Sequence, residues 1–260
     1  MTLSLPQFCG RMGRGDLHPS GAAVSEKIVR WLGEQQVQRV LEVGAGIGNT
    51  ATRMRTMGWD VVAIEPDPIL FRQLEARMGP RARSEPFLQH VTTRAYDAII
   101  AESVFFMLDL PTALRHAGSL LKPGGCLALV DAVWSDRISA AQSERLHDLT
   151  ASLFGIPVAS RQPMTHRDWL GHLSDAGFAA LHAERLPPGS TGQPPSRSER
   201  STMATLIRSP DLLPWMLRFR WRMRRTRLPA GALESWLFLA QRAPTNTGTR
   251  PHRSVQVEAG

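Results

Sequence analysis

A short apolar strand runs directly into a glycine-rich loop near residue 44, and this junction constrains the fold more than any other feature of the chain. Residues 40–48 read Val-Leu-Glu-Val-Gly-Ala-Gly-Ile-Gly, with three glycines at alternate positions. Glycine lets the backbone approach a ligand where any side chain would collide. Residues 49–57 can then form a helix whose N-terminal amides face the same ligand.

A carboxylate follows this loop at the distance that is typical of nucleotide-binding sheets. Residues 60–64 form a second apolar strand, and Glu65 follows it, about twenty residues after the first strand. Parallel strands would bring Glu65 and the glycine loop to the same edge of the sheet, where a carboxylate can accept both hydroxyls of a ribose. The third glycine comes too early for the pyrophosphate pattern GxGxxG, so the ligand is nucleotide-like without being a clear dinucleotide.

Five segments together resemble one enzyme family. Residues 41–48 resemble motif I of the class I S-adenosylmethionine-dependent methyltransferases, and Ala-Ile-Glu-Pro-Asp at 63–67 resembles their motif II. Residues 96–103, 120–129 and 173–178 resemble the fourth strand of the family, the turn into its fifth strand and the helix end before its sixth. The resemblance implies S-adenosyl-L-methionine as cofactor. The alternative is a Rossmann-like domain that binds NAD, or one whose glycines only form tight turns.

The predicted fold is a doubly wound, mostly parallel seven-stranded α/β sheet with an antiparallel edge hairpin, a helical cap and a basic amphipathic helix inserted before the last strand. Strand and helix signals alternate along the chain, as such a sheet requires. The predicted divisions are an N-terminal lid segment with the first helix (1–35), a methyltransferase core (36–186) with a cap insertion (134–164), a flexible linker (187–200), an Arg-rich helix with the last strand (201–242), and a disordered tail (243–260).

The family resemblance assigns eleven residues to the cofactor: Glu42, Gly44, Ala45, Gly46, Gly48, Glu65, Pro66, Ser84, Glu85, Glu102 and Ser103. By that resemblance the glycine loop would meet the methionine half, Glu42 would face its ammonium group and Glu65 would hold the ribose. Ser84 and Glu85 stand where the family contacts the adenine, although the segment departs from its common Gly-Asp-Ala form. Glu102 and Ser103 would line the space near the sulfonium.

A general base is needed only if the acceptor must lose a proton. His18 is the candidate, because its segment precedes the first helix and would close over the site by the same resemblance; a capping or packing role is the alternative. Six other histidines have no acidic partner at recognisable spacing, so we expect them at the surface: His90, His116, His147, His166, His172 and His182. The two cysteines lie far apart and show no metal-ligand spacing, so no metal site is predicted.

The charge of the chain is concentrated in one segment. The formal net charge is +8, and residues 197–227 hold nine arginines against two acidic residues, a local charge of +7. A helix that starts at Pro214 would gather an apolar face on an arc of ~100°, formed by Leu212, Trp215, Met216, Phe219 and Met223. Arginines would occupy the remainder. This pattern predicts a lid helix that packs on the domain. The alternatives are that the helix contacts an anionic substrate or carrier, a membrane surface or nucleic acid.

The composition fits a single α/β core with additions, since 42% of the 260 residues are hydrophobic. No secretory signal or membrane span is recognisable, and a cytoplasmic location is expected. The predicted function is methyl transfer to a small molecule or metabolite, and anionic acceptors are among the candidates. The alternatives are a protein that binds nucleic acid or an anionic surface through the Arg-rich helix, including an RNA methyltransferase, and an NAD-dependent oxidoreductase.

Overall fold

A computed structural model describes residues 3–15, 21–187, 209, 212–226, 229–244 and 255–258 of the chain. Its strands are β1 (Arg39–Val43), β2 (Asp60–Ile64), β3 (Ala82–Arg83), β4 (Tyr96–Glu102), β5 (Leu121–Trp134), β6 (Phe178–Arg185), β7 (Leu233–Arg242) and β8 (Val255–Glu258). Its helices are α1 (Leu5–Arg11), α2 (Ala22–Glu34), α3 (Asn49–Thr56), α4 (Pro68–Met78), α5 (Leu110–Leu120), α6 (Ala140–Phe154), α7 (His166–Asp175) and α9 (Leu212–Arg225), with short 3-10 turns η1 (Gly79–Arg81), η2 (Phe87–Gln89) and η3 (Phe105–Met107).

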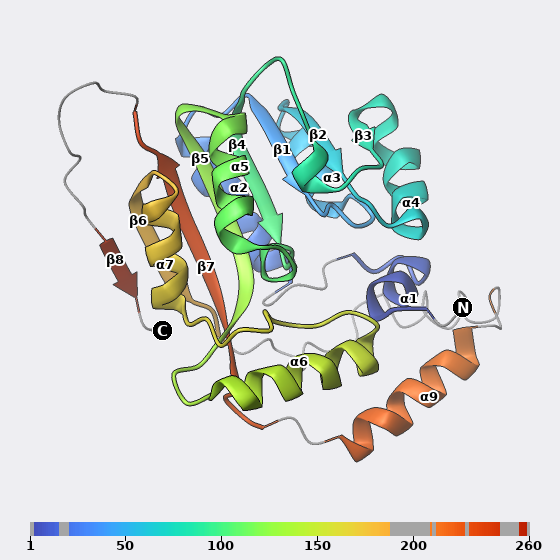
Figure 1. The fold of residues 1–260 in the computed structure, drawn as a ribbon. Coiled ribbons are helices and arrows are strands. Elements are labelled where there is room, and N and C mark those ends of the chain that lie inside the picture. Colours follow the sequence, from blue (N-terminus) through green and yellow to red (C-terminus); the bar gives the residue numbers. More distant parts are fainter. Residues whose placement is uncertain are drawn as a thin grey trace.

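The strands form one sheet in the order β3-β2-β1-β4-β5-β7-β6-β8 (Figure 1). β1, β2, β3, β4 and β5 are parallel, and β7 is antiparallel to both β5 and β6. The predicted doubly wound, mostly parallel sheet with an antiparallel pair at one side is therefore confirmed. The predicted cap region contains α6, and the basic helix α9 precedes β7 in the chain, as expected.

The described sheet has eight strands rather than the predicted seven. Val255–Glu258 forms β8 and pairs with β6 in parallel, from Leu181 opposite Val255 to Glu184 opposite Glu258. These four residues belong to the segment that was predicted to be a disordered tail, so that prediction is wrong for them. The outer edge of β6 offers unpaired backbone groups, which a short Val-Gln-Val-Glu segment can satisfy. The linker expected at 187–200 lies outside the described residues from 188 on.

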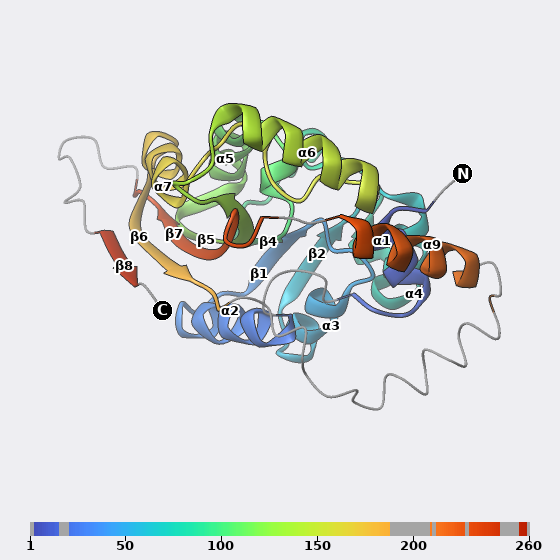
Figure 2. The ribbon, with the colours of Figure 1, turned by 90° about the horizontal axis from the view of Figure 1, so that it is seen from below.

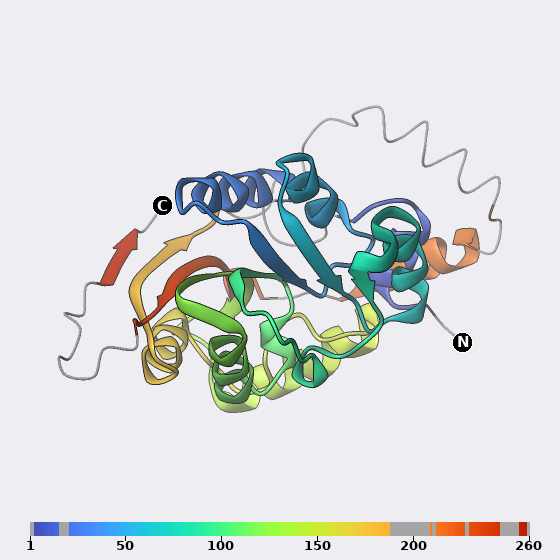
Figure 3. The same ribbon diagram turned by 90° about the horizontal axis from the view of Figure 1, so that it is seen from above.

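Helices cover both faces of the sheet (Figures 2 and 3). Alternate strand residues point to opposite faces. On one face Val40, Ala98 and Ile100 pack with residues of α2, α3 and α4. On the other, Leu41 and Ile99 pack with residues of α5 and α7. Two separate apolar cores fix the sheet between the helical layers, so the carboxyl ends of the central strands lie on a rigid support.

Capping residues fix where several of these helices begin. Asp67 accepts hydrogen bonds from the backbone N–H groups of Ile69 and Leu70 at the start of α4. Ser139 and Thr165 each take part in a capping box, at the starts of α6 and α7. Such caps satisfy N–H groups that have no partner inside the helix. The cap of α4 also matters for the site, because Asp67 lies two positions after Glu65.

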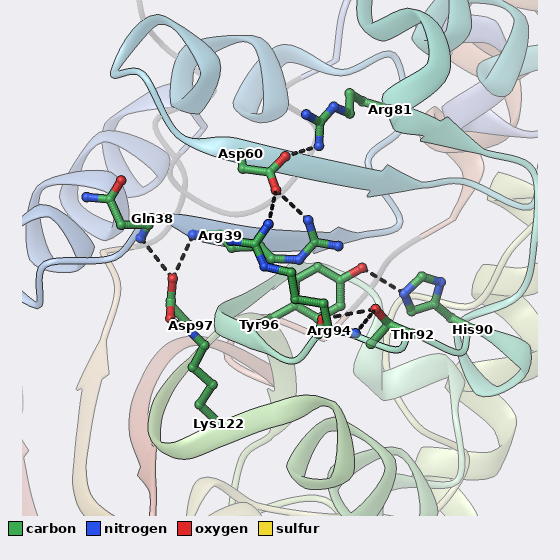
Figure 4. Close-up of polar contacts among 10 residues, drawn as sticks. All are labelled: Gln38, Arg39, Asp60, Arg81, His90, Thr92, Arg94, Tyr96, Asp97 and Lys122. Atoms are coloured by element: carbon green, nitrogen blue, oxygen red, sulfur yellow. Dashed lines mark hydrogen bonds and ion pairs between the residues drawn. The ribbon is translucent and has the colours of Figure 1, made fainter.

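The amino edge of the sheet is closed by ion pairs and hydrogen bonds (Figure 4). Asp60 at the start of β2 pairs with Arg39 of β1 and with Arg81. Asp97 of β4 accepts hydrogen bonds from the backbone N–H of Arg39 at 2.8 Å and from the Lys122 ammonium. These contacts join β1, β2, β4 and β5 at their beginnings. We therefore assign this network a structural role and look for the ligand site at the opposite edge.

Candidate functional site

The register of β1 and β2 places the glycine loop beside Glu65. Val43 lies opposite Ile64 in the parallel pair, so the two residues that follow, Gly44 and Glu65, leave the sheet side by side. The backbone N–H of Ala45 donates to the carbonyl of Ile64 at 3.0 Å, which ties the loop to β2. The predicted meeting of the glycine loop and the acidic residue at one carboxyl edge is present in the structure.

Glu65 is held by backbone groups on both of its carboxylate oxygens. Its Oε2 accepts a hydrogen bond from the N–H of Gly46 at 2.8 Å, and its Oε1 accepts one from the N–H of Asp67 at 2.9 Å. The side chain is buried, and burial raises its pKa to about 7 against the lowering effect of these two hydrogen bonds. Each carboxylate oxygen can accept more than one hydrogen bond. Glu65 is thus fixed in orientation and retains acceptor capacity.

Gly44 and Gly46 serve different purposes in the loop. Both have positive φ, 65° and 56°, a conformation that favours glycine. A Cβ at Gly44 would lie 2.4 Å from Cγ2 of Val104, so the loop is packed tightly against the residue after Ser103. Among the residues that the structure describes, a Cβ at Gly46 would meet nothing within 4 Å. The space beside Gly46 is therefore open, next to the carboxylate of Glu65.

Glu42 and Glu102 lie on the α2 and α3 side of the sheet. Glu42 of β1 is buried with 5% of its surface exposed. Glu102 at the end of β4 accepts hydrogen bonds from the hydroxyls of Ser25 at 2.7 Å and Thr50 at 2.8 Å. The carboxylate of Glu102 thus links β4 to α2 and α3, a role that sequence reasoning missed. Its predicted contribution to the wall near the sulfonium stays a prediction.

Ser103 turns the chain away from β4. Its φ is 60°, an unusual value for a residue with a side chain, and its N–H donates to the carbonyl of Val130 at 2.6 Å. The strained conformation directs Val104 onto Gly44. Ser103 therefore shapes the loop beside the site through its backbone, and a direct contact of its hydroxyl with the cofactor stays a prediction.

The segment predicted to meet adenine contains a buried hydrogen-bonded chain. Oε1 of Glu85 lies 2.6 Å from Nδ1 of His90, and Nε2 of His90 lies 2.9 Å from the hydroxyl of Tyr96. His90 is 4% exposed, so its expected surface position is wrong. Ser84 is exposed. The five-residue separation of Glu85 and His90 was a signal that the sequence offered and that the interpretation overlooked.

Asp131 is a further buried acid near the carboxyl edge, and it was missed from the sequence. Asp131 of β5 is completely buried, and its Oδ2 accepts a hydrogen bond from the N–H of Phe105 at 3.3 Å. Burial raises the pKa of Asp131 well above its usual value. Asp131 supports the start of η3, directly after the Val104 contact with Gly44. Its position inside a strand of apolar residues gave no sign of this contact.

The N-terminal segment covers the glycine loop. The side-chain amide of Gln7 in α1 donates to Asp67 at 2.7 Å. A Cβ at Gly10 would lie 2.4 Å from Leu70, and one at Gly15 would lie 2.7 Å from Ile47 of the loop. The chain from α1 to residue 15 thus packs on the loop and on α4. His18, the candidate general base, lies outside the described residues.

Helices α1, α6 and α9 lie beyond the carboxyl ends of the parallel strands (Figure 1), and aromatic side chains join them. Trp215 of α9 stacks on Phe8 of α1 with ring centroids 4.1 Å apart, and Phe219 lies 5.9 Å from Phe154 of α6. The indole N–H of Trp215 donates to the carbonyl of Leu3 at 2.7 Å. The predicted apolar face of the basic helix therefore packs on the domain itself.

The sheet order, the glycine loop and the acid at the end of β2 define a class I S-adenosylmethionine-dependent methyltransferase. The residues fit the cofactor, because the space that a Cβ at Gly46 would enter is open beside a buried carboxylate that still has acceptor capacity. Comparison with known proteins gives the same class. The family model for the methyltransferase domain matches residues 18–183, and the chain belongs to this family.

Individual relatives agree with this assignment. An uncharacterized methyltransferase of Mycobacterium tuberculosis is 30% identical over 196 residues, which cover 71% of this chain and 77% of the relative. A putative sarcosine dimethylglycine methyltransferase from Galdieria sulphuraria has a similar fold, with a TM-score of 0.59 and 18% identity over 85% of this chain and 86% of the other. A geranyl diphosphate C-methyltransferase from Streptomyces coelicolor, solved with S-adenosyl-L-homocysteine, gives a TM-score of 0.55 and 15% identity over 84% of this chain and 79% of the other.

Proposed function

We propose that this protein transfers a methyl group from S-adenosyl-L-methionine to a small-molecule acceptor, at the carboxyl edge between the glycine loop and helices α1, α6 and α9. The observation that carries the proposal is the open space at Gly46 beside the fixed carboxylate of Glu65. Family membership supports the reaction type and makes the NAD-dependent alternative untenable. The solved methyltransferase that binds geranyl diphosphate supports a small-molecule acceptor.

The cofactor supplies a methyl group on a positively charged sulfur, which is already a strong electrophile. Residues of the chain then have to bind the cofactor, orient the acceptor towards the methyl group and shield both from water. Glu65 would accept the ribose hydroxyls, since its two backbone hydrogen bonds hold the carboxylate still and leave acceptor capacity. The backbone of Gly44, Ala45 and Gly46 would hold the methionine half. Glu42 would face the ammonium group, directly or through water.

The helices beyond the carboxyl edge of the sheet, α1, α6 and α9, would position the acceptor. α6 belongs to the cap insertion, and α9 joins it to α1 through contacts between aromatic rings. Holding an acceptor in line with the methyl–sulfur bond and excluding water can lower a barrier by several kcal/mol. Because α6 and α9 are elements separate from the glycine loop, whereas α1 packs on it, substitutions in α6 and α9 should affect acceptor binding more than cofactor binding.

The proposal is tested by product mass. The purified chain is incubated with S-adenosyl-L-methionine that carries a deuterated methyl group and with a panel of metabolites that includes amines, phenols, carboxylates and isoprenoid diphosphates. The expected result is a labelled methyl group on one class of small molecule, with S-adenosyl-L-homocysteine formed in equal amount. Labelling of RNA with none of the small molecules labelled would overturn the small-molecule assignment.

A further inference from the structure

The basic helix α9 has a second apolar face that points away from the domain. Leu213, Leu217 and Trp221 are spaced four residues apart, so they lie along one side of the helix. They are 44%, 57% and 56% exposed. The inward face is different, because Leu212 and Trp215 are buried against the domain. From the sequence this outer side was assigned to arginines alone.

Arginines flank the outer face on both sides. Residues 212–225 hold five arginines and no acidic residue. At ~100° per residue, Arg220 and Arg224 fall within the same arc as the two leucines, and Arg218 and Arg222 lie on the far side of Trp221. The side chains of these four arginines are exposed. Three large apolar side chains set among positive charges are typical of a helix that lies in the interface of a membrane.

The inner face of α9 is fixed to the domain by aromatic contacts and a hydrogen bond. Trp215 is stacked between Phe8 and Phe219, at centroid distances of 4.1 and 4.9 Å, and its indole N–H is bonded to the backbone of Leu3. The outer face is thus presented by a helix that is already docked, at the periphery of the molecule beyond α1 (Figure 2). Among the described residues no helix is long and apolar enough to cross a membrane.

We propose that the outer face of α9 docks the protein onto an anionic lipid surface. A bilayer interface takes up both kinds of side chain, because lipid headgroups attract the arginines and the acyl boundary buries the leucines and the tryptophan. Nucleic acid would use the arginines and leave the leucines in water. The inference concerns attachment only and does not depend on the proposed function.

Sedimentation with vesicles tests the proposal on the full chain. Vesicles of phosphatidylcholine alone are compared with vesicles that also contain phosphatidylglycerol. The protein should sediment with the anionic vesicles only, and moderate salt should weaken the binding. Arg220→Gln with Arg224→Gln should weaken it roughly tenfold or more, since each arginine near an anionic surface contributes about fivefold. Arg30→Gln with Arg115→Gln, on exposed arginines of α2 and α5, is the matched control.

A second pair of variants tests the apolar part. Leu217→Gln with Trp221→Gln should weaken vesicle binding, whereas Met57→Gln with Val91→Gln should not, although Met57 and Val91 are equally or more exposed. Unchanged circular dichroism and cofactor affinity show that each variant is folded. The proposal is overturned if the wild type ignores anionic vesicles, or if the α9 variants bind as the wild type does. It is also overturned if the α9 variants keep vesicle binding and instead change the oligomeric state or the binding of duplex DNA in a gel-shift assay.

Discussion

Gly46 and Glu65 are 19 residues apart in the sequence and share a hydrogen bond of 2.8 Å, from the backbone N–H of the glycine to Oε2 of the carboxylate. The bond joins the loop after β1 to the end of β2. Glu65 is therefore oriented before any ligand binds, and the open side of Gly46 lies next to it. Pre-orientation of this kind lowers the cost of ordering a site on binding.

Removal of the Glu65 carboxylate should weaken the cofactor product. Hydrogen bonds to a charged acceptor are worth ~1.5–3 kcal/mol, so Glu65→Ala should reduce the affinity for S-adenosyl-L-homocysteine by roughly tenfold or more. Glu65→Gln keeps an acceptor oxygen, so its affinity for S-adenosyl-L-homocysteine should fall less. Calorimetric titration measures both. Thermal unfolding without ligand checks that each variant is folded, since Glu65→Ala also leaves the backbone N–H groups of Gly46 and Asp67 without their acceptor. An affinity equal to wild type in both variants would remove Glu65 from the site.

The raised pKa of Glu65 predicts a pH dependence. Its pKa is about 7 in the folded protein, against 4.5 as the usual value. Between these values the folded protein keeps a proton that the unfolded chain has lost, so the contribution of Glu65 to the free energy of unfolding falls as pH rises through this window. Binding changes in the opposite sense, because the ionised carboxylate accepts hydroxyls better.

The affinity for S-adenosyl-L-homocysteine should therefore rise by up to ~tenfold per pH unit as pH approaches 7, and then level off. Calorimetry at a series of pH values measures this slope. Glu65→Gln cannot ionise at this position and provides the control. If the wild type and this variant show the same slope, some other group causes the pH dependence.

Gly44 should matter for stability. Alanine there would place its Cβ 2.4 Å from Val104 and would keep a positive φ, so Gly44→Ala should lower the free energy of unfolding by ~1–3 kcal/mol. Adding Val104→Ala removes the clash and should restore part of the loss. Denaturant unfolding measures both variants. If the double variant is less stable by the full sum of the two single changes, the contact with Val104 does not explain the glycine.

The inner face of α9 should affect how the acceptor is bound and positioned. Trp215→Ala with Phe219→Ala removes the aromatic ring contacts that hold α9 on α1 and α6. We expect a higher KM for the acceptor or a lower kcat, with cofactor affinity within a few fold of wild type, because the glycine loop lies on other elements. Trp221→Ala, on the outer face, is the control with a soluble acceptor. Equal kinetics in all three proteins would show that α9 has no part in acceptor positioning.

The sequence was most informative where local order determines geometry. A strand, a glycine loop and a second strand with an acid at its end leave few arrangements, and Gly46 and Glu65 meet as expected. Contacts between distant segments could not be predicted in this way. Ser25 and Thr50 reach Glu102 across 77 and 52 residues, and only the packing of α2 and α3 on the sheet brings their hydroxyls there.

Two other differences have local causes. β8 is only four residues long and lies in a polar, low-complexity segment, so its pairing depends on the free edge of β6 rather than on a strong strand signal. In α9 the inner apolar face was predicted correctly, with Leu212 and Trp215 buried. The outer leucines were overlooked, because the arginines between them dominated the interpretation of that side.

The central claim is that the open space at Gly46 holds the cofactor, and a comparison of two glycines tests it most directly. Gly46 and Gly58 both have positive φ, and a Cβ at either would meet none of the described residues within 4 Å, but Gly58 lies in the turn after α3. Gly46→Val and Gly58→Val therefore carry similar backbone strain. Calorimetry with S-adenosyl-L-homocysteine should show binding to the wild type and to Gly58→Val, and none to a folded Gly46→Val. Normal binding by Gly46→Val would contradict the account.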